Sequence, residues 1–188
     1  MTAMAPLENY IVEHCAPTLA NLKTGTLFCV DTRESAELLR QIGLWNGFLR
    51  GKGISIMLLR QGEHKALVYL YRRSQLERDL KTEGVAEFLH SLGYNSQRTS
   101  ETLERLRERF EEEAGIPHEI GVFLGYPLCD VIGYIRNRGR NSKLTGCWQV
   151  YGDVDKAAKL FAKYRKCSNV YSKLWNEGRS VQQLTVCA

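Results

Sequence analysis

The chain has 188 residues, of which 44% are hydrophobic and 25% charged, the balance of an ordinary globular protein. Its formal net charge of +5 permits an anionic partner without requiring one, so nucleic-acid binding is not expected. No apolar run reaches the roughly 18 residues that a membrane-spanning helix needs. Residues 1–8 lack the basic and apolar regions of a signal peptide. We therefore expect one domain, residues 1–188, in the cytoplasm and without membrane contact.

Alternating patterns and turn residues predict the elements of the first half. Residues 7–16 have apolar positions at helical spacing, and Pro17 is expected to end or kink that helix. Residues 25–31 read as a buried strand. The next helix, 34–50, is expected to present a single apolar face made of Leu38, Leu39, Ile42, Trp45, Phe48 and Leu49.

A β-hairpin is predicted in the middle of the chain. Residues 54–60 and 65–73 are rich in strand-forming side chains, and a short turn containing Gly62 joins them. The alternation of the second strand places Leu67, Tyr69 and Tyr71 on one face and the intervening residues on the other. We expect the two strands to pair in antiparallel orientation.

The second half is predicted to be mainly helical. One further strand, 146–151, and a long amphipathic helix at about 154–177 follow the expected helices, which are 74–92, 99–114, 117–125 and 128–138. Strands that are few and dispersed among helices indicate an α+β fold. We expect a small, mainly antiparallel sheet with a central hairpin, covered by several helices.

A distinctive motif occupies residues 117–127. It combines His118 and Glu119 with Gly121, Gly125 and Tyr126. His and Glu can exchange protons or bind a metal, and glycines allow another backbone or a flat ligand to approach closely. The zinc-protease pattern HExxH is absent, because Val122 follows His118 by four positions. The structural alternative is a helix N-terminus that Glu119 and His118 merely cap.

A second candidate is the pair His14 and Cys15. If Pro17 opens a new helical turn, its amide donors would lower the thiol pKa of Cys15 and make it a nucleophile, a redox thiol or a soft metal ligand. The alternative is that Cys15 packs into the core. The six cysteines contain no CxxC pair, so free thiols are expected rather than a closed zinc site.

Basic and aromatic residues are interleaved toward the C-terminal part of the chain. Such a pattern can bind nucleic acid or a carboxylate-bearing ligand, and it can also be a solvated surface. The residues concerned are Arg136, Arg138, Arg140, Lys143, Trp148, Tyr151, Lys163, Arg165 and Lys166.

Several segments together resemble one bacterial family, common in anaerobes and known only as a domain of unknown function. The resemblance covers nearly the whole chain and is carried by residues 14–19 (HCAPTL), by residues 118–127 (HEIGVFLGYP), by Trp148 with residues 150–153, and by Lys166-Cys167. The chain has Asn21 where the family pattern has glycine, a departure from the tight turn that glycine would favour.

The resemblance implies work with iron, haem or redox chemistry, and a flavodoxin-like redox partner. His14, Cys15, His118 and Cys167 are residue types that bind haem iron or a transition metal. The expected function is therefore the binding of a small ligand or cofactor, in iron or haem handling or in thiol redox. Two alternatives stand beside it: a thiol-dependent enzyme that uses Cys15 with His14 or His118 as base, and a non-catalytic protein or nucleic-acid interaction module that uses residues 136–166.

Overall fold

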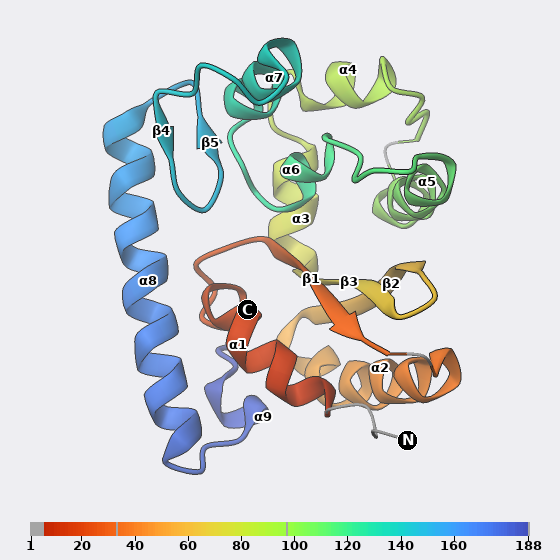
Figure 1. Cartoon of the computed structure of the whole chain (residues 1–188), viewed down its shortest axis with the longest axis vertical. Coiled ribbons are helices and arrows are strands. Elements are labelled where there is room, and N and C mark those ends of the chain that lie inside the picture. Colours follow the sequence, from red (N-terminus) through yellow and green to blue (C-terminus); the bar gives the residue numbers. More distant parts are fainter. Residues whose placement is uncertain (1–5, 33, 97, 188) are drawn as a thin grey trace. The chain divides into compact units, whose positions relative to one another are not determined.

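The computed structural model describes residues 6–32, 34–96 and 98–187. It confirms the α+β class (Figure 1). The helices are α1 Leu7–Leu19, α2 Ser35–Leu49, α3 Arg73–Leu80, α4 Val85–His90, α5 Thr99–Glu112, α6 Ile120–Phe123, α7 Leu128–Asn137, α8 Val154–Asn176 and α9 Val181–Leu184, with a 3-10 turn at Arg50–Lys52. The strands are β1 Gly25–Asp31, β2 Ile54–Gln61, β3 Lys65–Arg72, β4 Leu144–Thr145 and β5 Gln149–Val150.

The chain divides into two compact units. Unit 1 comprises residues 1–75 and 167–188, and unit 2 comprises residues 76–166. The expectation of a single domain over residues 1–188 stays a prediction. Within the described ranges, no helix is both long enough and apolar enough to cross a membrane.

Unit 1 is built on a three-stranded antiparallel sheet with the strand order β1-β3-β2. The predicted hairpin is confirmed, because β2 pairs with β3 and Ile56 lies opposite Leu70. An irregularity between Leu58 and Arg60 shifts the register near the turn, as a bulge does. Residues that alternate along each strand share one face of this sheet, and that face is apolar.

Helices α1, α2 and α9 contribute to one apolar core with this face. Buried side chains of this core come from every one of these elements: Ile11 and Cys15 from α1, Leu38 and Ile42 from α2, Phe28, Val30, Val68 and Leu70 from the sheet, and Val181 and Leu184 from α9. The expected apolar face of α2 is only partly correct, since Leu39 and Phe48 are exposed. Gly43 and Gly47, the two glycines of α2, have no side chains. They therefore do not extend the buried apolar face of the helix to these two exposed residues.

The end of α1 differs from the expectation. Pro17 lies inside the helix, which continues to Leu19. Proline removes one backbone hydrogen bond, and the burial of residues 15–19 in the core offsets that loss. The turn itself is present: Asn21 adopts a left-handed φ of 61°, and Leu22 donates its backbone N–H to the Pro17 carbonyl. Asparagine is the residue other than glycine that commonly ends a helix in this way.

A buried arginine closes unit 1. The Arg72 guanidinium is fully buried and donates to the main-chain carbonyls of Thr18, Leu19 and Val186 at 2.6, 2.6 and 2.9 Å. Burial lowers the pKa of this guanidinium from its ordinary value. Because the acceptors come from α1 and from the C-terminal segment, Arg72 ties these two distant parts of the sequence to the end of β3.

Between residues 73 and 151, the structure differs from three of the predicted elements. Residues 74–92 form two helices, α3 and α4, because Gly84 adopts a left-handed φ of 79° between them. The helix expected at 117–125 is reduced to the single turn α6. The strand expected at 146–151 is a two-residue strand, β5, paired with β4 in a small hairpin of its own. The predicted long helix is confirmed as α8.

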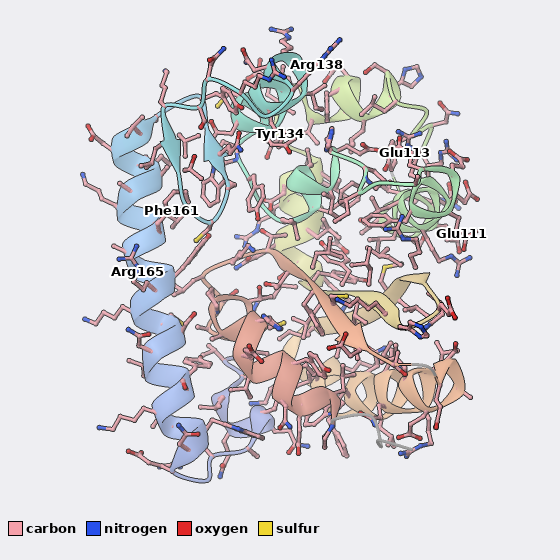
Figure 2. The ribbon with its side chains drawn as sticks, in the orientation of Figure 1. Glu111, Glu113, Tyr134, Arg138, Phe161 and Arg165 are labelled. Atoms are coloured by element: carbon pink, nitrogen blue, oxygen red, sulfur yellow. The ribbon has the colours of Figure 1, made fainter. Side chains whose placement is uncertain are left out.

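The β4–β5 hairpin packs on the first half of α8. Trp148, Val150, Phe161 and Tyr164 form a buried cluster, and Figure 2 shows Phe161 projecting from α8 toward the hairpin. The rings of Trp148 and Phe161 meet edge to face with centroids 4.5 Å apart. This geometry is favourable for aromatic pairs, so α8 supplies a firm backing for the hairpin.

Candidate functional site

An aromatic pocket lies within unit 2, and we call it the aromatic pocket throughout. Its volume is about 520 Å³, within the range of pockets that hold small ligands and cofactors. The walls come from the segment before α6, from α6 and α7, and from the β4–β5 hairpin. The lining residues are Ile116, His118, Ile120, Gly121, Tyr126, Asp130, Val131, Tyr134, Thr145, Gly146, Cys147, Trp148 and Gln149.

One carboxylate holds the walls together. Asp130, on α7, is only 3% exposed, and its Oδ2 accepts a hydrogen bond from Trp148 Nε1 at 2.8 Å. Its Oδ1 accepts from the backbone N–H groups of Tyr151 and Gly152 at 2.8 and 2.7 Å. A buried carboxylate needs such partners, and these three donors satisfy it. Asp130 therefore fixes the hairpin to α7 and sets the orientation of the Trp148 ring.

Stacked rings form one side of the aromatic pocket. Tyr126 stacks on Trp148 with ring centroids 4.7 Å apart, and its hydroxyl donates to the main-chain carbonyl of Cys147 at 3.3 Å. Burial raises the pKa of the Tyr126 phenol to about 12. This phenol is therefore neutral at physiological pH and serves as an apolar wall with one polar atom.

One of the polar side chains that line the aromatic pocket is His118, which lies at its mouth. Its imidazole is exposed and meets the Tyr134 ring edge to face, with centroids 5.0 Å apart. Contact with the ring orients the imidazole without using up its nitrogens. His118 can therefore donate to or accept from a ligand, or coordinate a metal that the ligand carries.

The two glycines of the motif have different roles. Gly121 is buried and lines the aromatic pocket, and a Cβ added there would lie 2.8 Å from Val131 Cγ2. Because Gly121 has no Cβ, α6 and α7 can approach closely. The atoms of α7 that lie against Gly121 belong to the Val131 side chain and not to the backbone. Gly125 has a φ of 78°, which ends the α6 turn and leads the chain toward α7.

Glu119, by contrast, points away from the aromatic pocket into an ion-pair network. It is 3% exposed, and its Oε1 accepts from Arg109 Nε at 2.9 Å and from the Tyr94 hydroxyl at 3.2 Å. Arg109 also pairs with Glu113. Burial, followed by the nearby Glu119 charge, raises the pKa of Tyr94. Glu119 thus connects α5 to the start of α6, a structural role that leaves its carboxylate already occupied.

The thiol of Cys15 is in the core of unit 1. Cys15 has no exposed surface, and burial raises its pKa above the ordinary value of 9.0. The expectation of a lowered thiol pKa is therefore wrong: α1 continues past Pro17, so no helix N-terminus lies beside Cys15. His14 is exposed and stacks on Phe28 with ring centroids 5.9 Å apart.

The convergence of the metal candidates stays a prediction. His14, Cys15 and Cys167 belong to unit 1, and His118 belongs to unit 2. Burial also raises the pKa of Cys167, which is partly buried on α8. In the described ranges, no three or more His, Cys, Asp or Glu side chains are grouped so that they could hold a metal ion.

The basic and aromatic segment separates into two kinds of residue. Trp148 is only 8% exposed and is held by Asp130, so it offers no stacking face to a nucleic-acid strand outside the pocket. The Tyr151 hydroxyl donates within the same region, to the Arg140 carbonyl. Arg136, Arg138, Arg140 and Lys143 are exposed, and Figure 2 shows Arg138 at the end of α7.

Sequence reasoning missed Asp130, Tyr134 and Cys147 as residues of the pocket. Asp130 sits in a regular helical pattern, and an acidic residue in the first turn of a helix is ordinary. Cys147 is exposed at the tip of the hairpin. Asp130 is a polar residue at a position of α7 that faces inward. That mismatch was the signal in the sequence that could have identified it.

Fold and pocket together define a small α+β protein whose second unit carries an aromatic pocket of ligand size. The chain belongs to the family described as protein of unknown function DUF3793, whose model matches residues 11–185. This confirms the resemblance to a domain of unknown function. Comparisons with curated proteins and with solved structures gave no match.

Proposed function

We propose that this protein binds a small, planar, largely apolar ligand or cofactor in the aromatic pocket. The observation that carries the proposal is the combination of a volume of about 520 Å³ with the rings of Tyr126, Tyr134 and Trp148 around it. Flat apolar molecules gain from contact with such rings and from leaving water. His118 at the mouth supplies a polar group that distinguishes one end of the ligand from the other.

Haem is the cofactor that best matches this description. Its macrocycle is planar and largely apolar, apart from its two propionates, and a single imidazole such as that of His118 could ligate its iron, so a group of three protein ligands is not required. The His118 imidazole is exposed at the aromatic pocket and makes no hydrogen bond to another described residue, so its nitrogens remain available. The role in iron or haem handling follows from this ligand class, and a flavodoxin-like redox partner would serve a redox-active cofactor.

The thiol-dependent alternative is less well supported. Cys15 would need to reach a substrate as a thiolate, and it is buried with a raised pKa. The interaction-module alternative retains exposed basic residues, but its aromatic partners Trp148 and Tyr151 are engaged within unit 2. The aromatic pocket therefore provides the stronger basis for a function.

Fluorescence of Trp148 tests the proposal. In a variant with Trp45→Phe and Trp175→Phe, Trp148 is the remaining tryptophan, and a ring bound beside it should quench or shift its emission. Titration with haemin and with iron-free protoporphyrin separates ring binding from iron coordination. Ile116→Asp would place a charge at the exposed wall of the pocket and should weaken both, whereas Val170→Asp, on exposed α8 surface, should not.

Iron coordination has its own readout. His118→Ala should abolish the shift of the visible haemin band while leaving protoporphyrin binding nearly unchanged. If neither porphyrin quenches Trp148 at micromolar concentration, a planar ligand of this class is excluded. If haemin binds equally well in the parent and in His118→Ala, with the same spectrum, His118 is not an iron ligand.

A further inference from the structure

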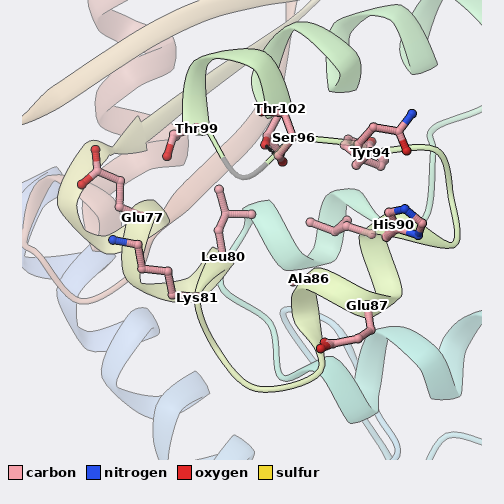
Figure 3. Close-up of a pocket in the computed structure, with 12 residues that line it drawn as sticks. Glu77, Leu80, Lys81, Ala86, Glu87, His90, Tyr94, Ser96, Thr99 and Thr102 are labelled. Atoms are coloured by element: carbon pink, nitrogen blue, oxygen red, sulfur yellow. Dashed lines mark hydrogen bonds between the residues drawn. The ribbon is translucent and has the colours of Figure 1, made fainter.

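Unit 2 contains a second cavity of different chemistry, which we call the ionic pocket. Its volume is about 580 Å³, and it shares no lining residue with the aromatic pocket. The end of α3, the helix α4, residues 94–96 and the first turn of α5 surround it. Figure 3 shows Glu77 and Lys81 on one side of this cavity and Glu87 and His90 on the other.

Each side of the ionic pocket thus presents one acidic group and one basic or imidazole group. The hydroxyls of Ser96 and Thr99 line the α5 side. The Ser96 hydroxyl already accepts from the Arg98 backbone N–H at 3.1 Å, and that of Thr99 can donate or accept. Leu80, Ala86 and Leu89 supply apolar surface. A cavity with acceptors and donors for both signs of charge is suited to a molecule that carries both signs itself.

These charges are not neutralised within the protein. None of the Glu77, Lys81, Glu87 and His90 side chains makes a hydrogen bond or ion pair with another described residue. The neighbouring helix α5 behaves differently, since Arg105 pairs with both Glu108 and Glu112 along its exposed side. The chain therefore forms ion pairs on helices where the geometry permits them.

The end of α3 explains why one pair is missing. Glu77 and Lys81 are four residues apart, the spacing at which a Glu and a Lys normally pair on a helix. Helix α3 ends at Leu80, so Lys81 has left the helical path before the pair can form. Both side chains thus remain exposed beside the cavity, where water and not a protein group solvates their charges.

We infer that the ionic pocket binds a small zwitterionic molecule of the size of a short peptide. Its carboxylate is held by Lys81 on the α3 side and its ammonium group by Glu87 on the α4 side, and its body lies on the apolar surface of Leu80, Ala86 and Leu89. The cavity volume is in the range that holds ligands of this size. This inference is independent of the aromatic pocket, and neither depends on the other.

A series of tripeptides that differ only in charge tests the inference. Trialanine is used with free ends, with its amine acetylated, with its carboxylate amidated, and with both ends blocked. Binding at millimolar concentration is followed by the amide NMR signals of residues 86–99. The zwitterion should bind best, and each lost charge should weaken binding by up to about fivefold, as expected for exposed ion pairs.

Two exposed variants assign the charges to residues. Lys81→Gln should weaken the peptides that retain a carboxylate and leave the amidated form unchanged. Glu87→Gln should weaken those that retain an amine and leave the acetylated form unchanged. Lys159→Gln and Glu111→Gln, elsewhere on exposed surface of unit 2, are matched controls that should change nothing.

Several outcomes would overturn the inference. Equal binding of all four peptides would mean that the charges play no part, and signals that shift only around Trp148 would place the peptide in the aromatic pocket. The absence of any shift at millimolar concentration would exclude zwitterions of this class. None of these results bears on porphyrin binding.

Discussion

Removing the Asp130 carboxylate is the sharpest test of how the aromatic pocket is built. In Asp130→Ala, the indole N–H of Trp148 and the amides of Tyr151 and Gly152 lose their acceptor. A buried donor left without a partner costs about 1–3 kcal/mol. The indole N–H of Trp148 is buried and bears the full cost. The two amides belong to half-buried residues, so water can accept part of the hydrogen bonding that they lose.

The expected loss in the free energy of unfolding is therefore about 3–5 kcal/mol. Asp130→Asn keeps the shape and one acceptor oxygen, but its amide group would face a donor, so a loss of about 1–2 kcal/mol is expected. Asp155→Asn, an exposed substitution in the first turn of α8, should change the stability by less than about 0.5 kcal/mol.

Urea unfolding of the single-tryptophan protein measures these differences. Trp148 reports directly on the wall that Asp130 holds, so its emission maximum should move toward that of exposed indole in Asp130→Ala even before unfolding. Porphyrin binding should fall in the same order as stability. A free energy of unfolding within about 1 kcal/mol of the parent would contradict this account of the pocket, because three donors that lose their acceptor cannot cost so little.

Three further predictions concern packing, a buried charge and a buried thiol. Gly47→Ala, with nothing within 4 Å of the added Cβ, should raise the thermal midpoint, and Gly121→Ala, 2.8 Å from Val131 Cγ2, should lower it; the opposite signs would contradict the packing. Arg72→Met should cost about 2–4 kcal/mol in urea unfolding, because it removes three charge-assisted hydrogen bonds, although the Thr18 and Leu19 carbonyls keep one backbone donor each; unchanged stability would show that these bonds are dispensable. The folded-state pKa of Cys15 is raised above 9.0, so the unfolded chain loses the thiol proton first and stability should fall as pH rises above about 9. Cys15→Ala should flatten that decline, and an identical slope would assign it to other groups.

Local patterns were sufficient where local interactions decide the structure. The β2–β3 hairpin follows from alternation and a short turn, and α8 follows from one long apolar stripe. The error at residues 74–92 also has a local cause. The apolar positions continue with nearly helical spacing, and only the left-handed conformation of Gly84 separates α3 from α4.

Tertiary packing decided the cases that local patterns could not. Pro17 is a helix breaker by propensity, yet it lies inside α1 because the side chains around it are buried. The same continuation removes the helix N-terminus that would have activated Cys15. A correct reading of the thiol therefore required knowledge of the core against which α1 packs, which the sequence near residue 17 does not contain.

The adjacent residues His118 and Glu119 show where sequence reasoning about a site ends. As a pair they suggested shared acid–base or metal chemistry, but neighbouring side chains in a tight turn point in different directions. Glu119 turns inward to Arg109 and Tyr94, two residues of other segments, and its charge is neutralised there. His118 turns outward to Tyr134 and the aromatic pocket. The buried ion pair fixes the backbone at the start of α6, and that anchor holds the imidazole at the mouth of the pocket. The chemistry available to a ligand therefore comes from His118, and the position from which it acts comes from Glu119.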